Sequence, residues 1–463
     1  MIERGPDVAM VLANYRNGSR DPEGVVANAL VALDARGREL GATAWLLDDS
    51  ARAAAEDSAR RWRQGVPRPL EGVPFGVKDN IQIAGAPTQF GSPHYSGFIP
   101  STTAQVVEAL CRAGAIPVAK LSTYEFACGP ITEVLNPWGT DRIAGGSSSG
   151  PCAAVAAGLV PFAVGTDTGG SVRVPAAWCG VVGIKPTFGR VSRRGVAPLS
   201  WTLDHVGFIA RTAHDTAAIL AAAGGWDELD SYSVDGAPFV ADSSIERSLS
   251  GLRVGVIDNW FLDDCQEDVL RAFDIAMDVI GADGAEVARV GLSILGGLNP
   301  DAIKHTIVEA ETASFHESAE LDVGNYGRVF ESVVRAGRRQ STVDYLHAMR
   351  LCAVVRAEVA KVFDRVDVIA VPTSCVVAPP NGIDEMPIAG RSRDIGDLVA
   401  RNTSIFNIAG CPAVTVPCGF DHDGMPIGLQ IVTPPWREGL GLQVAHRFQQ
   451  STEHHLVAPA QSL

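Results

Sequence analysis

Apolar residues recur at two different spacings along this chain, and the alternation between the two predicts an α/β fold. Helical spacing predicts helices within residues 6–65 and at 102–113, 151–159, 269–280, 300–365 and 440–450. Short apolar runs bounded by turn residues predict strands at 44–47, 73–78, 116–119, 162–164, 180–185, 252–257, 366–372, 413–417 and 427–432. This strand–helix–strand order favours a central mixed, mostly parallel β-sheet covered by helices on both faces.

We expect one large domain over residues 1–463, because neither an internal repeat nor a long linker divides the sequence. A helical N-terminal arm spans about residues 1–65, and the core of the domain spans about 66–215. A variable, helix-rich lobe follows at about 226–365. The closing strands and helix are predicted at about 366–455.

Composition and charge narrow the functional classes. Hydrophobic residues make up 46% of the chain, and the formal net charge is −15, which argues against binding to nucleic acid or to an anionic membrane. Nine cysteines occur without a C-x-x-C pair, so the sequence indicates neither a zinc site nor a disulfide framework. Met1 to Asp7 lacks the order of a signal peptide, and no apolar run is long enough to span a membrane. A cytoplasmic enzyme is therefore expected.

Two Gly/Ser turns, at residues 145–150 and 165–175, gather hydroxyl groups and backbone N–H groups beside apolar segments. These groups are suited to nucleophilic attack on a carbonyl. The pattern Gly146-x-Ser148-x-Gly150 also matches the nucleophile elbow of α/β-hydrolases, but that elbow needs a preceding strand, which the sequence does not predict here. A phosphate-binding P-loop would need a lysine after the glycines, where the chain has Pro151.

A hydroxyl nucleophile needs a base, and neither turn contains a histidine. His94, His205 and His214 are the nearest in sequence, and we interpret them as structural or surface residues. The remaining candidate is Lys78, at the end of a predicted strand. The pKa of an ordinary lysine amine, about 10.4, would have to fall by roughly three units, about 4 kcal/mol, for Lys78 to act as a base near neutral pH. Burial or the positive end of a nearby helix could lower the pKa in this way, whereas a solvent-exposed lysine would stay protonated.

Several segments together resemble the amidase signature family, which includes fatty acid amide hydrolase and the catalytic subunit of the tRNA-dependent glutamine amidotransferase. Ser147 and Ser171 are 24 residues apart, as in that family. The similar segments are residues 76–79, 145–150, 165–175, 183–187, 203–207 and 428–431. The chain departs from the family at Ser149, where the family often has glycine.

The resemblance implies a triad of Ser171, Ser147 and Lys78. Ser171 would be the nucleophile that forms an acyl-enzyme. Ser147, on a cis peptide bond, would relay its proton, and Lys78 would be the final base. Neither a metal nor an organic cofactor is expected.

Around the triad, the second turn is expected to supply an oxyanion hole. Its backbone N–H donors are those of Thr168, Gly169, Gly170 and Ser171. Arg173 is expected to pair with an internal carboxylate such as Asp167 rather than with a substrate. Supporting roles are expected for Ser148, Ser149, Thr166 and Asp167, and a purely turn-forming role for each is the competing interpretation.

The substrate is expected to be a small-molecule amide. Apolar segments around Phe126, Cys128 and Trp201 are the predicted substrate pocket, which favours an uncharged or aromatic acyl group. The short segment between Phe126 and Asn136 favours a stand-alone amidase, expected as a homodimer, over the amidotransferase subunit. An esterase or a carbamoyl-amide hydrolase that uses the same site also fits these motifs. A non-catalytic binding protein fits them less well, because all three triad positions are filled.

Overall fold

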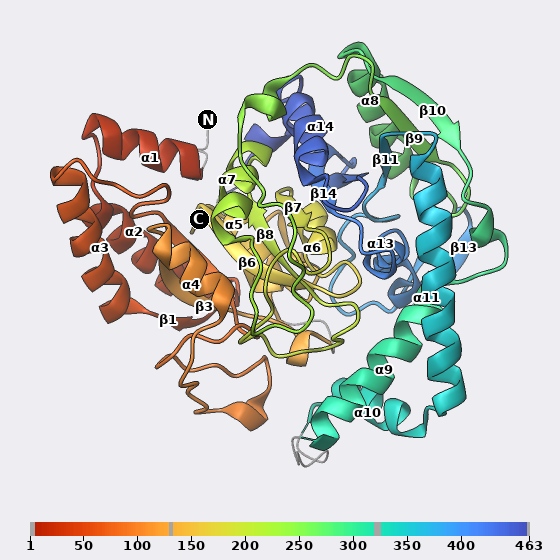
Figure 1. The fold of residues 1–463 in the computed structure, drawn as a ribbon, viewed down its shortest axis with the longest axis horizontal. Coiled ribbons are helices and arrows are strands. Elements are labelled where there is room, and N and C mark those ends of the chain that lie inside the picture. Colours follow the sequence, from red (N-terminus) through yellow and green to blue (C-terminus); the bar gives the residue numbers. More distant parts are fainter. Residues whose placement is uncertain (1–4, 129–132, 319–325, 461–463) are drawn as a thin grey trace.

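An 11-stranded mixed sheet runs through the computed structural model, which describes residues 5–128, 133–318 and 326–460 (Figure 1). Its strands, in spatial order, are β1 (Thr43–Leu46), β3 (Ile116–Leu121), β2 (Pro74–Lys78), β6 (Phe162–Asp167), β8 (His205–Ala210), β7 (Val182–Lys185), β14 (Ala413–Phe420), β15 (Pro426–Val432), β11 (Val368–Pro372), β9 (Arg253–Ile257) and β10 (Glu286–Val290). Two hairpins lie outside this sheet: β4 (Leu135–Asn136) with β5 (Gly139–Ile143), and β12 (Glu385–Ile388) with β13 (Arg391–Asp394).

Strand direction changes along the sheet. The pairs β2–β3, β2–β6, β9–β10 and β9–β11 are parallel. The strands from β6 through β8, β7, β14 and β15 to β11 pair antiparallel, as does β1 with β3. The predicted mixed α/β sheet is confirmed. Its parallel pairing is found in the two outer groups, where helical crossovers join the strands, and not between them.

Helices cover both faces of the sheet. They are α1 (Val8–Asn17), α2 (Pro22–Ala32), α3 (Asp48–Arg63), α4 (Gln105–Arg112), α5 (Ser149–Ala156), α6 (Arg173–Trp178), α7 (Ala213–Ala223), α8 (Glu267–Ala282), α9 (Pro300–Ser318), α10 (Arg328–Arg339), α11 (Thr342–Phe363), α12 (Ile395–Val399), α13 (Ser404–Ile408) and α14 (Glu438–Gln450). In Figure 1 the arm α1–α3 lies at one end of the molecule and the lobe α9–α11 at the other. None of the described helices has the length and apolar composition of a membrane-spanning helix.

Strand β11 shows why its sequence is a continuous apolar run. Val368 and Ala370 belong to the core that includes residues of α8 and α14. Ile369 and Val371 belong to the core beneath α9, α11 and α13. Because successive side chains of a strand point to opposite faces, a strand covered on both sides has no solvent-facing position for a polar residue.

The predicted elements appear close to their expected places, with corrections at the local level. Helix α5 begins at Ser149, two residues before the predicted start at residue 151, with Ser148 as its N-cap. The sequence pattern does not predict strands β8 and β10. Four of the five residues of β10 are exposed and two are charged, so it lacks the apolar run that identifies buried strands. Residues 1–4, 129–132, 319–325 and 461–463, which fall within the predicted arm, pocket segment, lobe and C-terminus, lie outside the described residues.

Candidate active site

Lys78 and Ser147 meet in the interior of the molecule. Lys78 ends β2 and Ser147 immediately precedes the N-cap of α5, a helix that packs against β2 and β6. The Nζ of Lys78 donates to Ser147 Oγ at 2.8 Å and to Thr166 Oγ1 at 2.7 Å. The Gly146–Ser147 peptide bond is cis. Two of the three expected triad residues are therefore in direct hydrogen-bond contact.

Burial changes the proton affinity of Lys78. Its side chain is fully buried, and this burial lowers the pKa of the amine from its ordinary value of 10.5 to about 7, with Asp167 and Asp204 acting in the opposite direction. Asp79, the nearest carboxylate in sequence, is engaged elsewhere, because it pairs with Lys120 at 2.8 Å. Lys78 is therefore substantially uncharged near neutral pH, as a general base must be.

This pKa predicts an acidic limb in the pH profile. Below about pH 7 the Lys78 amine binds a proton and cannot accept another, so kcat/KM for an amide substrate should fall about tenfold per pH unit. Steady-state kinetics over roughly pH 5 to 9 would check this. The matched control is Lys185→Met, since burial and then Arg173 also lower the pKa of Lys185 to about 7. An acidic limb that disappeared in Lys185→Met would contradict the assignment to Lys78.

Asp167 organises the turn that carries Ser171. Its carboxylate accepts the N–H groups of Gly170 at 2.8 Å and Val172 at 3.1 Å. Burial by itself would raise the pKa of Asp167, but Arg173 holds it well below its usual range. The expectation that the Gly170 N–H faces an oxyanion is corrected, because this group is committed to Asp167. Thr168, Gly169 and Ser171 remain as the candidate oxyanion donors.

The Ser171 hydroxyl is only partly buried. Among the described residues it has no hydrogen-bond partner, whereas the Ser171 carbonyl accepts the N–H of Ser148 at 3.1 Å. The structure thus ties the two Gly/Ser turns together through their backbones and gives no hydrogen bond between the Ser147 and Ser171 hydroxyls. Ser148 bonds the backbone of Thr166 through its own Oγ, at 3.1 Å to the carbonyl and 3.3 Å to the N–H. Ser149 is buried in the first turn of α5.

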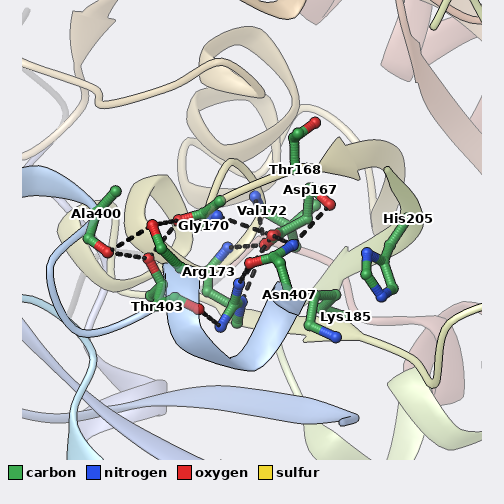
Figure 2. A network of polar contacts seen from close by, with 12 residues as sticks. Asp167, Thr168, Gly170, Val172, Arg173, Lys185, His205, Ala400, Thr403 and Asn407 are labelled. Carbon is green, nitrogen blue, oxygen red and sulfur yellow. Dashed lines mark hydrogen bonds and ion pairs between the residues drawn. The ribbon is translucent and has the colours of Figure 1, made fainter. Parts of the chain in front are cut away.

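Arg173 connects this turn to the C-terminal part of the chain (Figure 2). The guanidinium forms a bidentate pair with Asp167, at 3.0 and 2.8 Å, and both side chains are fully buried. It also donates to the Thr403 carbonyl, to Gln430 Oε1 and to Asn407 Oδ1, and Asn407 donates in turn to Asp167. The expected internal pairing of Arg173 with Asp167 is therefore observed.

Gly170 leaves no room for a side chain. Its φ is +130°, and an added Cβ would lie 2.2 Å from Thr403 Oγ1 and 2.9 Å from Thr403 Cβ. We predict that Gly170→Ala displaces the turn and lowers kcat/KM on the order of 100-fold, since small misplacements of reacting groups cost about that much. Gly251→Ala is the matched control, because Gly251 has φ +80° and open space around it. Equal kinetics for the two variants would refute this account.

A cavity of about 160 Å³ adjoins the buried lysine. Thr166, whose hydroxyl accepts from Lys78, lines it together with Asn80, Thr168, Asp204 and His205. Arg193, Trp201, Asp230 and Tyr232 also line it. Arg193 donates to the Trp201 carbonyl at 2.7 Å and lies over the rings of Phe188 and Tyr232.

The three residues predicted to line the substrate pocket lie in different surroundings. Trp201 lines the cavity, but Phe126 is 3% exposed and packs in an aromatic cluster with Phe90 and Phe330. Ala127 takes the position at the cavity that the sequence assigned to its neighbours. Cys128 is partly buried between two hydrophobic cores, and burial raises the pKa of its thiol to about 11.

In the described part of the chain, one group of side chains has a geometry that could hold a metal: Asp268, Asp421 and His422, whose ligand atoms lie within 4.8 Å of one another. Asp268 already pairs with Arg271 and His422. These residues lie on α8 and after β14, outside the cavity lining.

A family model described as Amidase matches residues 25–442, which is most of the chain. The chain belongs to the amidase signature family. It is therefore a member of a class of enzymes that act on amide C–N bonds, and the fold and motifs predicted from the resemblance agree with this membership.

Relatives of this amidase have different named roles. A glutamyl-tRNA(Gln) amidotransferase subunit of Synechococcus sp. (strain RCC307) is 34% identical over 470 residues, covering 95% of this chain and 96% of the relative. A solved structure reported as a vestigial protein complex that reveals the evolutionary origins of an s-triazine catabolic enzyme is 32% identical, with a TM-score of 0.90, over 96% of this chain and 98% of the other. The glutamyl-tRNA(Gln) amidotransferase subunit of Thermotoga maritima is 28% identical, with a TM-score of 0.76, over 93% and 91%.

Sequence reasoning missed several residues that this amidase brings to the site. Asn80 follows Lys78 by two residues and Asp204 lies within the similar segment 203–207, so both positions were available signals. Asn407 and Gln430 lie more than 230 residues from Arg173 along the chain. A lone glutamine within the buried run of β15 was the available sign of an internal polar partner.

Proposed function

We propose that this chain hydrolyses a carboxamide through an acyl-enzyme on Ser171. Ser147 would carry the proton of Ser171 to Lys78, and the same groups would later protonate the departing amine. The observation that carries the proposal is the 2.8 Å contact between the Ser147 hydroxyl and a fully buried amine whose pKa is about 7. An amine in that state can accept a proton near neutral pH, and an alcohol becomes a competent nucleophile only when its proton is removed.

The oxyanion would be stabilised by the second turn. With the Gly170 N–H committed to Asp167, the N–H groups of Thr168, Gly169 and Ser171 are the proposed donors. Each such donor contributes about 2.7–4 kcal/mol in comparable enzymes. In this proposal Asp167 and Arg173 act as positioning residues, because they hold the turn without contacting the substrate.

The relatives favour the amidotransferase subunit, which the sequence analysis placed second, over the stand-alone amidase. Relatives named as glutamyl-tRNA(Gln) amidotransferase subunits match most of the chain at 34–36% identity. They support a role in releasing ammonia from an amide donor for a partner protein. The stand-alone amidase is kept as the second candidate, because the TM-score is higher with a solved 6-aminohexanoate cyclic dimer hydrolase that is 27% identical, 0.89, than with the solved Thermotoga maritima protein, 0.76.

Ammonia release and acyl-enzyme trapping would test the proposal. The purified chain would be offered L-glutamine, propionamide and benzamide, and the ethyl esters of the corresponding acids. Ammonia and acid would be measured, and the protein and its proteolytic peptides would be analysed by mass spectrometry. Ammonia in equal amount to acid, with an acyl mass on a peptide containing Ser171, is the expected result. Turnover without any acylated Ser171 under rapid quenching would overturn the mechanism. Glutamine turnover that needed a co-purified second protein would favour the amidotransferase assignment over the stand-alone one.

A further inference from the structure

A lysine of the helix-rich lobe lies against the turn that carries Ser171. Lys304 is on α9, which packs against α13. A Cβ built on Gly169 would lie 2.8 Å from Lys304 Cδ and 3.6 Å from Lys304 Nζ. The φ of Gly169 is not in the left-handed region, so the backbone conformation does not by itself call for glycine here. The Lys304 side chain fills the space that a side chain at position 169 would need.

The charge of Lys304 also acts on Cys128. Burial raises the pKa of the Cys128 thiol to about 11, and the Lys304 charge acts in the opposite direction. Ala127 and Thr168, which immediately precede Cys128 and Gly169 in the chain, line the cavity of about 160 Å³. The cavity and Lys304 therefore meet the same two segments at consecutive residues.

The Lys304 ammonium is held in place and has N–H groups left over. Its Nζ donates to Asp301 Oδ1 at 2.7 Å, and the same oxygen accepts from Ser404 Oγ at 2.7 Å. Asp301 is the one hydrogen-bond partner that the described residues give Lys304 Nζ, although an ammonium group has three N–H donors. The side chains of Lys304 and Asp301 are 12% and 16% exposed. A cation that is already fixed and largely removed from water binds an anion at less cost than a mobile, solvated one.

Lys304 is close to the accessible side of the nucleophile turn. Ser171 and Gly169 are partly exposed, whereas Ser147 and Lys78 are buried. An acyl group has to reach Ser171 Oγ from the accessible side, and Gly169 precedes Ser171 by two residues. Because consecutive Cα atoms are about 3.8 Å apart, the distance from the ammonium to the nucleophile is on the scale of a short carbon chain.

We propose that Lys304 is a specificity-determining residue that binds a carboxylate at the far end of the acyl group, which makes the substrate class the monoamides of short dicarboxylic acids. This inference rests on the proposed acyl-enzyme function. It differs from the uncharged or aromatic acyl group that the apolar segments of the sequence favour. Asp301 is a positioning residue in this account, because it holds the ammonium and does not contact the substrate.

Matched pairs of amides test the role of Lys304. The monoamides of malonic, succinic and glutaric acid are compared with propionamide, butyramide and valeramide, which have chains of the same length and no carboxylate. The ratio of kcat/KM within each pair is measured by ammonia release at low ionic strength. The wild type should prefer the monoamide at one chain length or more. Lys304→Met should lower that ratio about 10- to 100-fold, the scale of a hydrogen bond to a charged group, and Lys304→Arg should keep part of it.

Three further variants sharpen the comparison. Lys361→Met is the matched control, because Lys361 also pairs with a carboxylate three residues away but is 67% exposed; it should keep the wild-type ratio. Asp301→Asn combined with Lys304→Met removes both charges, and its ratio should stay low, since lost attraction rather than new repulsion by Asp301 is the cause. Lys304→Gln, which can keep a hydrogen bond to Asp301, should show the same loss if Lys304→Met does not fold.

A wild-type enzyme that did not prefer the monoamide at any chain length would overturn the inference, as would failure of all three monoamides to react. A ratio unchanged in both Lys304→Met and Lys304→Gln would overturn it too, and so would recovery of the wild-type ratio in the double variant. Turnover that persisted in Ser171→Ala would instead defeat the proposed function. Turnover that depended on Ser171, with a ratio indifferent to Lys304, would defeat the present inference alone.

Discussion

Ser171→Ala is expected to lower kcat/KM for amide hydrolysis by a factor on the order of 10⁴ or more, because loss of a serine nucleophile removes the covalent route as a whole. The fold should persist, since the Ser171 hydroxyl has no hydrogen-bond partner among the described residues. Steady-state kinetics with ammonia detection, beside a thermal melting curve, would measure both effects.

Ser148→Ala is the matched control for that variant. Its hydroxyl bonds only the backbone of Thr166 in the described structure, so its loss should cost no more than about tenfold, the scale of one hydrogen bond. If Ser171→Ala kept more than about a tenth of wild-type turnover, or if Ser148→Ala were the more damaging change, the nucleophile would have been misassigned.

Arg173→Leu is expected to destabilise the protein by about 3–5 kcal/mol, because it leaves the buried carboxylate of Asp167 without its counter-charge. Both side chains are fully buried, so water does not reach the carboxylate in the place of the guanidinium. Urea unfolding followed by fluorescence would show a midpoint shifted to lower urea with little change in slope.

The surface pair of Arg52 and Asp48 provides the comparison. Their side chains are 49% and 48% exposed, so Arg52→Ala should leave the urea midpoint almost unchanged. A double variant, Asp167→Asn with Arg173→Leu, should be less destabilised than Arg173→Leu alone, since it removes the uncompensated charge. If the single and double variants unfolded at the same urea concentration, the stabilising role of the ion pair would have to be abandoned.

The motifs predicted the chemistry of the site better than its surroundings. Lys78 and Ser147 could be identified because their residue types, spacing and resemblance to a family agree, and the structure brings them into contact. The distant partners of Arg173 could not, because Asn407 and Gln430 arrive through strand order rather than through local sequence. Local patterns carry no information on which distant segment a buried charge will meet.

Phe126, predicted to line the substrate pocket, does not line the cavity, and its backbone conformation explains why. Phe126 and Ala127 have φ values of 46° and 61°, in the left-handed region that non-glycine residues seldom adopt. This conformation turns the aromatic side chain into the protein and presents Ala127 to the cavity. Hydrophobicity predicted that the segment was buried, but nothing in its residue types predicted which side chain would face the ligand.

The hydrogen bonds of Arg173 to residues far along the chain determine when its turn can form during synthesis. Its acceptors at Thr403, Asn407 and Gln430 are among the later residues to be synthesised. A nascent chain or a proteolytic fragment ending before them would contain every motif of the signature segment and still lack the anchor of its nucleophile turn. Catalytic competence should therefore emerge only after the segment from α13 to β15 has docked on the earlier part of the chain.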